Sequence, residues 1–281
     1  MSSPLFTKSE QPIIVNQYSD LYRSNEYDYL GHKFWENGCG PSSIANAFIS
    51  GFDITDANTA AELLRDVMHI MSGNPRIHQV DIKRFPLLVE NESVILQYCE
   101  DNGWEIVAYD KQLTPEELLQ LCEAAPIVIL SKQVGNEYWK AAIQYAQYLY
   151  EHNQTDATLY LVRASVGVTS TGGPLAIGQA GHFVTFCMPV KNFIEEGSIY
   201  LIDSAASALP GEAFGKLEYY KQQYPFVAHP WMHKAFLQRF GTERIHPNIV
   251  RFYLLDPSDD KAAAANLFKL YGTTFWIFFI K

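Results

Sequence analysis

Residues 36–43 read Glu36-Asn37-Gly38-Cys39-Gly40-Pro41-Ser42-Ser43. Asn37, Gly38 and Gly40 are turn-forming residue types, and a proline at position 41 fits the first turn of a helix. Apolar residues then recur at helical spacing, at Ile44, Ala45, Ala47 and Phe48. The pattern predicts a loop that turns into a helix, with Cys39 at the helix N-terminus.

This position would make the Cys39 thiol reactive. Unpaired N–H groups at a helix N-terminus favour a thiolate over a thiol, and they can face an oxyanion that develops on a bound carbonyl group. The glycines on either side allow a ligand backbone to approach closely. The alternative is a small buried cysteine beside a helix cap. A cysteine between two glycines and before a proline favours the reactive thiol.

The composition is typical of a globular protein. Of the 281 residues, 48% are hydrophobic and 19% are charged, and the chain is long enough to bury a substantial core. No internal repeat, charge block or low-complexity linker divides the sequence. We therefore expect a single domain over residues 1–281.

Charge and cysteine usage restrict the partners and the compartment. The 21 Lys and Arg residues and 31 Asp and Glu residues give a net charge of −10, which argues against nucleic acid or an anionic membrane as a partner. The four cysteines, at positions 39, 99, 122 and 187, lack paired metal spacing and favour a reducing compartment. Residues 1–17 contain no apolar run of signal-peptide length. We expect a cytoplasmic protein, with unconventional secretion left open.

Hydrophobic periodicity and capping signals predict both helices and strands along the chain. Helices are predicted at 56–71, 93–102, 116–124, 136–151, 211–222, 231–240 and 260–270. Short strands are predicted at 12–17, 104–109, 126–130, 157–164, 249–255 and 273–280. This mixture indicates the α+β class.

Two further predicted strands carry polar residues at their ends. Residues 181–187 begin with a histidine, His182, and residues 198–203 end with an aspartate, Asp203. An antiparallel hairpin around a loop at 189–197 would place these two residues opposite each other, with Cβ atoms about 5 Å apart. The pattern predicts an imidazole and a carboxylate within reach of each other.

Cys39, His182 and Asp203 form a plausible catalytic set. Acyl transfer by a thiol requires a nucleophile, a histidine that exchanges protons with the thiol and the leaving amine, and a carboxylate or amide that orients the histidine. Activity near neutral pH would follow if the cysteine and histidine rest as thiolate and imidazolium, with Asp203 holding the imidazole tautomer.

Three motifs together resemble the papain-fold cysteine peptidases, and most closely the bacteriocin-processing (double-glycine leader) peptidase-like family. They are Gly38-Cys39-Gly40-Pro41-Ser42-Ser43, Gly181-His182-Phe183-Val184 and Tyr200-Leu201-Ile202-Asp203-Ser204-Ala205. The resemblance implies a papain-like fold, in which an N-terminal helical part with the nucleophile helix packs on an antiparallel sheet carrying the histidine and aspartate. It also implies that Gln17, which follows a short apolar strand, is the oxyanion-hole glutamine.

The sequence departs from that family in three respects. The family's aspartate is often followed by proline, where Ser204 stands here. The chain is longer than a typical member, with a helical insertion near 133–180 and an extended C-terminal region. No transporter segment accompanies the domain, so leader-peptide processing during export is not implied.

We therefore expect a cysteine peptidase or amidohydrolase that acts on a peptide or protein through a Cys39 thioester, without a cofactor. Two alternatives stay open, namely a papain-fold acyltransferase or transglutaminase-like enzyme and a non-catalytic binding module. His229 and His233 have the spacing of a metal pair, with His246 as a further candidate, but Pro230 disturbs the intervening turn, so we expect no metal site. The sequence does not indicate the oligomeric state.

Overall fold

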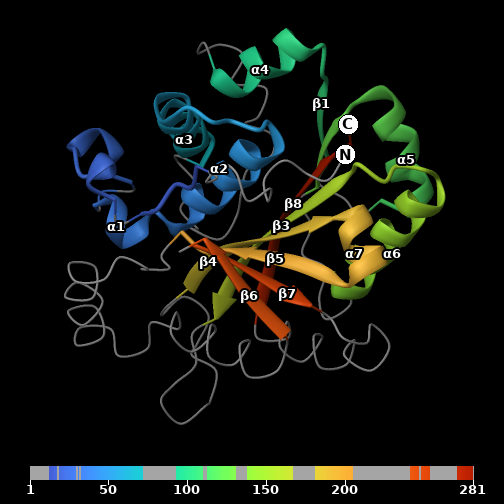
Figure 1. Cartoon of the computed structure of the whole chain (residues 1–281). Helices are drawn as coiled ribbons and strands as arrows, with labels where there is room; N and C mark the ends of the chain where they lie inside the picture. The colour runs from blue at the N-terminus through green and yellow to red at the C-terminus, as the bar shows by residue number, and fades with distance from the viewer. Residues whose placement is uncertain are drawn as a thin grey trace.

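The computed structural model describes residues 13–17, 19–29, 31, 33–71, 93–109, 113–130, 138–166, 181–204, 241–246, 248–253 and 271–280. The helices predicted at 211–222, 231–240 and 260–270 lie outside these ranges. In the described part the chain is a mixed α+β structure (Figure 1). No helix there combines the length and the apolar character needed to cross a bilayer.

The helices match most of the predicted ranges. They are α1 (Phe34–Asn37), α2 (Cys39–Gly51), α3 (Ala57–Met71), α4 (Val94–Asn102), α5 (Pro115–Ala124), α6 (Tyr138–Glu151) and α7 (Val190–Glu196), preceded by the 3₁₀ turns η2 (Asp20–Tyr22) and η3 (Asn25–Tyr27). The strands are β1 (Ile106–Tyr109), β2 (Ile127–Leu130), β3 (Thr158–Val166), β4 (Gly181–Pro189), β5 (Ser198–Ile202), β6 (Gly241–His246), β7 (Ile249–Tyr253) and β8 (Tyr271–Phe279).

The strands of the described chain form one sheet in the order β1-β2-β8-β3-β4-β5-β7-β6. β1 and β2 run parallel, and the other neighbours are antiparallel. The sheet is therefore mixed, whereas we expected an antiparallel one. β3 and β8 lie side by side near its middle, although they come from the region expected to be an insertion and from the extended C-terminal region.

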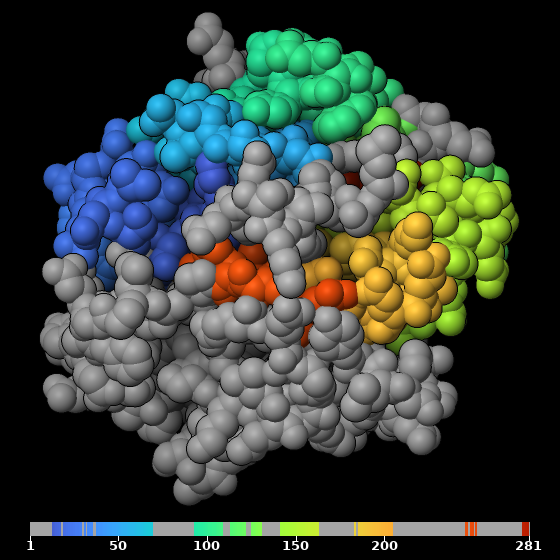
Figure 2. Space-filling model, viewed as in Figure 1, coloured from blue at the N-terminus to red at the C-terminus, as the bar shows by residue number. Residues whose placement is uncertain are grey.

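Helices cover both faces of the sheet. α2, α3 and α4 lie on one face, and α5, α6 and α7 lie on the other (Figure 1). Strand β4 shows the alternation that this requires, because Phe183 and Cys187 belong to the first core, whereas Phe186 and Met188 belong to the second. On the side seen in Figure 2, α4 adjoins α3 and α7 adjoins α6.

Helix α2 is buried along its whole length between α3 and the sheet. The sequence predicted one apolar face, but the polar side of the helix is buried as well. Two of its polar groups join elements: Ser50 Oγ lies 2.5 Å from Tyr160 Oη on β3, and Thr185 Oγ1 on β4 donates to the Ser43 carbonyl at 2.7 Å. These bonds compensate for the loss of water.

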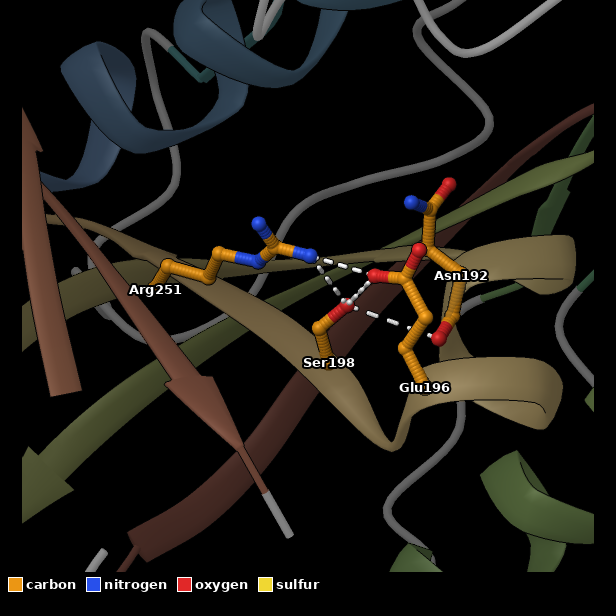
Figure 3. Close-up of polar contacts among 4 residues, drawn as sticks. All are labelled: Asn192, Glu196, Ser198 and Arg251. Atoms are coloured by element: carbon orange, nitrogen blue, oxygen red, sulfur yellow. Dashed lines mark hydrogen bonds and ion pairs between the residues drawn. The ribbon is translucent and has the colours of Figure 1, made fainter. Parts of the chain in front are cut away.

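Helix α7 occupies the segment predicted to be a loop between β4 and β5. It ends at Glu196 and is capped by Gly197, whose φ of 69° lies in the left-handed region that favours glycine. A polar cluster joins the helix to β5 and β7 (Figure 3). Arg251 pairs with Glu196 and donates to Ser198 Oγ at 3.2 Å, while Ser198 Oγ lies 3.4 Å from the Asn192 carbonyl oxygen. These contacts tie the helix end to the sheet.

Candidate active site

Helix α2 begins at Cys39, as the sequence predicted. Gly38 precedes it with φ of −75°, and its N–H donates to the Phe34 carbonyl at 2.6 Å. A Cβ atom at position 38 would lie 2.4 Å from that same carbonyl oxygen. The glycine is therefore required by the tight junction between α1 and α2, a reason separate from ligand approach.

Backbone N–H groups from two elements act on the sulfur of Cys39. Those of Phe183, of Gly40 and of Cys39 itself lower the pKa of the thiol. Two of these residues open α2, and Phe183 belongs to β4, immediately after His182. The sulfur thus lies where the start of α2 meets the start of β4.

The pKa of Cys39 corrects one expectation. The N–H groups of Phe183 and Gly40 do lower it, as predicted for a helix N-terminus. Burial has the larger effect, and together with the negative charge of Asp203 it raises the pKa of Cys39 to about 11. Cys39 is only 7% exposed, so few water molecules can solvate a thiolate. The thiol is the favoured form at neutral pH.

The hairpin register differs from the predicted one. The β4–β5 ladder pairs Cys187 with Tyr200 and Thr185 with Ile202, so Asp203 follows directly after its last residue. His182 stands three residues before Thr185 and is not directly opposite Asp203. The helix α7 in the connection shifts the register by two residues from the predicted one. The backbone of His182 lies in β4, and its side chain lies outside the described part of the chain.

Asp203 is fully buried at the end of β5. Its N–H donates to the Asn248 carbonyl at 2.9 Å, and Asn248 Nδ2 donates to the Asp203 carbonyl at 2.7 Å. Its charge raises the pKa of Cys39, so the carboxyl group and the sulfur are electrostatically coupled. Asn248 was not predicted, since it comes from a turn between β6 and β7 with no sequence pattern that points to Asp203.

Gln17 lies against the same strand end. Its N–H donates to the Ser204 carbonyl at 3.0 Å, and Ser204 Oγ donates to Gln17 Oε1 at 3.2 Å. Gln17 Nε2 donates to the Trp35 carbonyl in α1 at 3.1 Å. The structure therefore brings Gln17 next to the Asp203–Ser204 pair and to the helix that precedes Cys39. The contacts of Ser204 with Gln17 were not predicted, although the sequence shows Ser204 directly after Asp203.

Residues 13–17 form no strand of the sheet, contrary to prediction. Their backbone is instead held by a side chain of α2, because Val15 N–H donates to Asn46 Oδ1 at 2.7 Å and Asn46 Nδ2 donates to the Val15 carbonyl at 3.2 Å. A buried amide thus replaces a neighbouring strand. The sequence carried no signal for this role of Asn46, which is one of several polar residues in α2.

Tyr29 is a further neighbour of the sulfur that the sequence did not indicate. Burial raises the pKa of this phenol well above its ordinary value, and the charge of Cys39 raises it further. The phenol is 3% exposed and stays neutral over the whole physiological range. It adds a hydrogen-bonding hydroxyl to the surroundings of the site without adding charge.

We expected no metal site at His229 and His233, and both residues lie outside the described part of the chain. Within the described ranges, no group of three His, Cys, Asp or Glu side chains is arranged to hold a metal ion. Burial lowers the pKa of His246, and its Nδ1 accepts a hydrogen bond from Asn248 N–H at 3.1 Å. This nitrogen therefore serves the turn that holds Asp203.

Neither protein-family models nor curated proteins give a match to this chain.

Proposed function

We propose that this chain is a papain-like cysteine hydrolase that cleaves a peptide or related amide bond through a thioester on Cys39. The observation that carries the proposal is the meeting of α2 and β4 at one sulfur atom. Backbone N–H groups of Gly40 and Phe183 lower the pKa of Cys39, and the charge of Asp203 raises it, so all three act on the sulfur. Gln17 lies beside the same aspartate through Ser204.

Each residue has a defined part in the proposed reaction. Cys39 Sγ attacks the carbonyl carbon of the scissile amide, and the thiol proton passes to His182. The imidazolium gives this proton to the amine nitrogen as the C–N bond breaks, which leaves an acyl group on the sulfur. A water molecule deprotonated by the same imidazole then attacks the thioester and restores the thiol.

The raised pKa of Cys39 affects the first step. Because the thiol is the favoured form, the proton leaves the sulfur as the attack proceeds, and His182 acts as a general base. Asp203 would orient the imidazole and stabilise its positive charge. The Gln17 amide and the Cys39 N–H would stabilise the oxyanion that develops on the substrate carbonyl.

The burial of Cys39 favours a second candidate within the same chemistry. A thioester formed on a cysteine that is 7% exposed would be protected from water, and an amine could attack it instead. The chain would then be an acyltransferase or a transglutaminase-like enzyme. Product analysis with a competing amine separates the two, because a new amide forms only in the transfer reaction.

We also propose that the protein works in the cytoplasm. Among the described cysteines, Cys39, Cys99 and Cys187 carry free thiols. A reducing compartment would keep Cys39 available as a nucleophile.

The test is a comparison of three proteins on one peptide library. The wild-type protein and a Cys99→Ser control, whose altered cysteine is buried in α4, are expected to produce the same cleaved peptides. Cys39→Ser is expected to lose at least 1,000-fold in cleavage rate. Cleavage that persists in Cys39→Ser would overturn the proposal. Peptides bound but never cleaved by the wild-type protein would instead indicate a binding module.

A further inference from the structure

We propose that Ser204 is a positioning residue that fixes the Gln17 amide with its N–H groups toward the reacting carbonyl oxygen. This inference rests on the proposed function, because it assigns a role within the same site. It concerns a residue at which this chain departs from the family it resembles, since proline often follows the aspartate there.

The partners of Gln17 determine which way its amide points. The Trp35 carbonyl oxygen can only accept a hydrogen bond, so the amide atom 3.1 Å from it is the nitrogen Nε2. The oxygen Oε1 then faces Ser204 Oγ, which can donate, at 3.2 Å. Both contacts agree on one orientation of the amide.

Because the Gln17 amide is buried, its orientation depends on these two hydrogen bonds. Gln17 is 5% exposed and Ser204 is fully buried, so water cannot replace a lost hydrogen bond at Oε1. Without the hydroxyl group, Oε1 loses its donor and the Trp35 carbonyl alone restrains the amide plane. The amide would then rotate over a wider range, and its N–H groups would be less well aligned with a developing oxyanion.

Ser204 also fixes the backbone of Gln17, since its carbonyl accepts the Gln17 N–H at 3.0 Å. The residue immediately before it is Asp203. The dipeptide Asp203–Ser204 therefore carries the carboxylate and also holds the backbone N–H and the side-chain oxygen of Gln17. A proline at position 204 could accept the backbone bond but has no hydroxyl group to orient the side chain.

A double-mutant cycle on the peptide identified by the library tests this role. We expect Gln17→Ala to lower kcat by about 100-fold or more, because one oxyanion donor is lost. Ser204→Ala should lower kcat by roughly tenfold with KM unchanged, and should have less than a twofold effect when Gln17 is already alanine. Equal effects of Ser204→Ala in both backgrounds would overturn the proposal, since a merely structural role does not depend on the amide.

Two controls separate positioning from damage to the fold. Ser198→Ala removes another fully buried serine hydroxyl, at the opposite end of β5, and should leave kcat unchanged. Alkylation of Cys39 by iodoacetamide forms no oxyanion, so its rate should be the same in Ser204→Ala and wild type. If Ser204→Ala does not fold, Ser204→Cys takes its place in the cycle, because a thiol is a much weaker donor.

The orientation of the amide can also be measured without activity. The side-chain ¹⁵N–H₂ signals of Gln17 should shift and exchange faster with each other in Ser204→Ala. Unchanged signals would overturn the inference whether or not the protein cleaves peptides. A wild-type protein that cleaves nothing, with signals that do respond to Ser204→Ala, would overturn the proposed function and leave the positioning role supported.

Discussion

Asn46 shows how one side chain can replace a strand. It lies in the fully buried helix α2, and both polar ends of its amide bind the backbone of Val15. The segment it holds carries Gln17 two residues later. A residue that looks structural therefore supports the position of a candidate catalytic group.

Asn46→Ala should lower both stability and activity. The change leaves the buried N–H and carbonyl of Val15 without their partner, which costs about 2–4 kcal/mol of unfolding free energy. Urea unfolding measures this loss, and cleavage assays on the folded fraction should show a lower kcat because Gln17 is displaced. Asn58→Ala, at an exposed position of α3, is the matched control and should stay within about 0.5 kcal/mol of wild type. An unfolding free energy unchanged by Asn46→Ala would contradict this account.

Individual residue types predicted the site only where a reactive residue stands among residues that form turns. The Gly-Cys-Gly-Pro run located the start of α2 because each residue type has a conformational preference there. Ser204 has no such preference, and the turn preference of Asn248 does not indicate its partner Asp203. Their roles arise from tertiary contacts with residues far away in sequence, which no local pattern encodes.

At the scale of elements, capping signals and periodicity predicted helices better than they predicted the segments that connect strands. Thr114 and Glu117 form a capping box at the start of α5, and Pro115 occupies its first turn, so the helix begins one residue before the predicted start at 116. Helix α7 was missed because its seven residues bury only Val190 and Phe193, too few to establish a period. Its presence shifted the hairpin register, since register depends on the connection as well as on the strands.

The junction between α1 and α2 gives a prediction at the same scale. A Cβ atom at position 38 would lie 2.4 Å from the Phe34 carbonyl oxygen, and one at position 51 would lie 2.3 Å from the Phe279 ring. Gly38→Ala and Gly51→Ala should each destabilise the fold by about 1–3 kcal/mol through overpacking. Only Gly38→Ala should also lower kcat of the folded protein, because position 51 is about 18 Å from Cys39 along the helix.

Thermal unfolding and cleavage rates distinguish the two variants. Equal kcat values in the two folded proteins would show that the α1–α2 junction does not position the sulfur.

The whole molecule depends on pairings that the sequence pattern could not reveal. β8, near the C-terminal end of the sequence, lies between β2 and β3, and β4 joins this central part to β5. Periodicity identified most of these strands but carries no information on their order. The α+β class could therefore be predicted, whereas the mixed sheet and its central strands could not.

Alkaline pH should destabilise the whole molecule. Burial raises the pKa of several thiols and phenols, including Cys39 to about 11, and Cys99 and Tyr145 to about 12. The folded state therefore retains protons that the unfolded chain loses above about pH 9, and the free energy of unfolding falls as the pH rises from 9 to 12. Cys39→Ser should remove about 2–3 kcal/mol of this fall by pH 11.

Urea unfolding of wild type and Cys39→Ser between pH 7 and pH 11 measures the effect. Constant stability across this range would contradict the burial of these groups.

The most direct test of the central claim is to detect the covalent intermediate. An activated ester of a short peptide is mixed with the protein, the reaction is stopped with acid within milliseconds, and the acylated residue is located by mass spectrometry. We predict one acyl group, attached to Cys39, with Cys99, Cys122 and Cys187 unmodified. Ester hydrolysis that leaves Cys39 unmodified, or equal acylation of all four cysteines, would contradict the account.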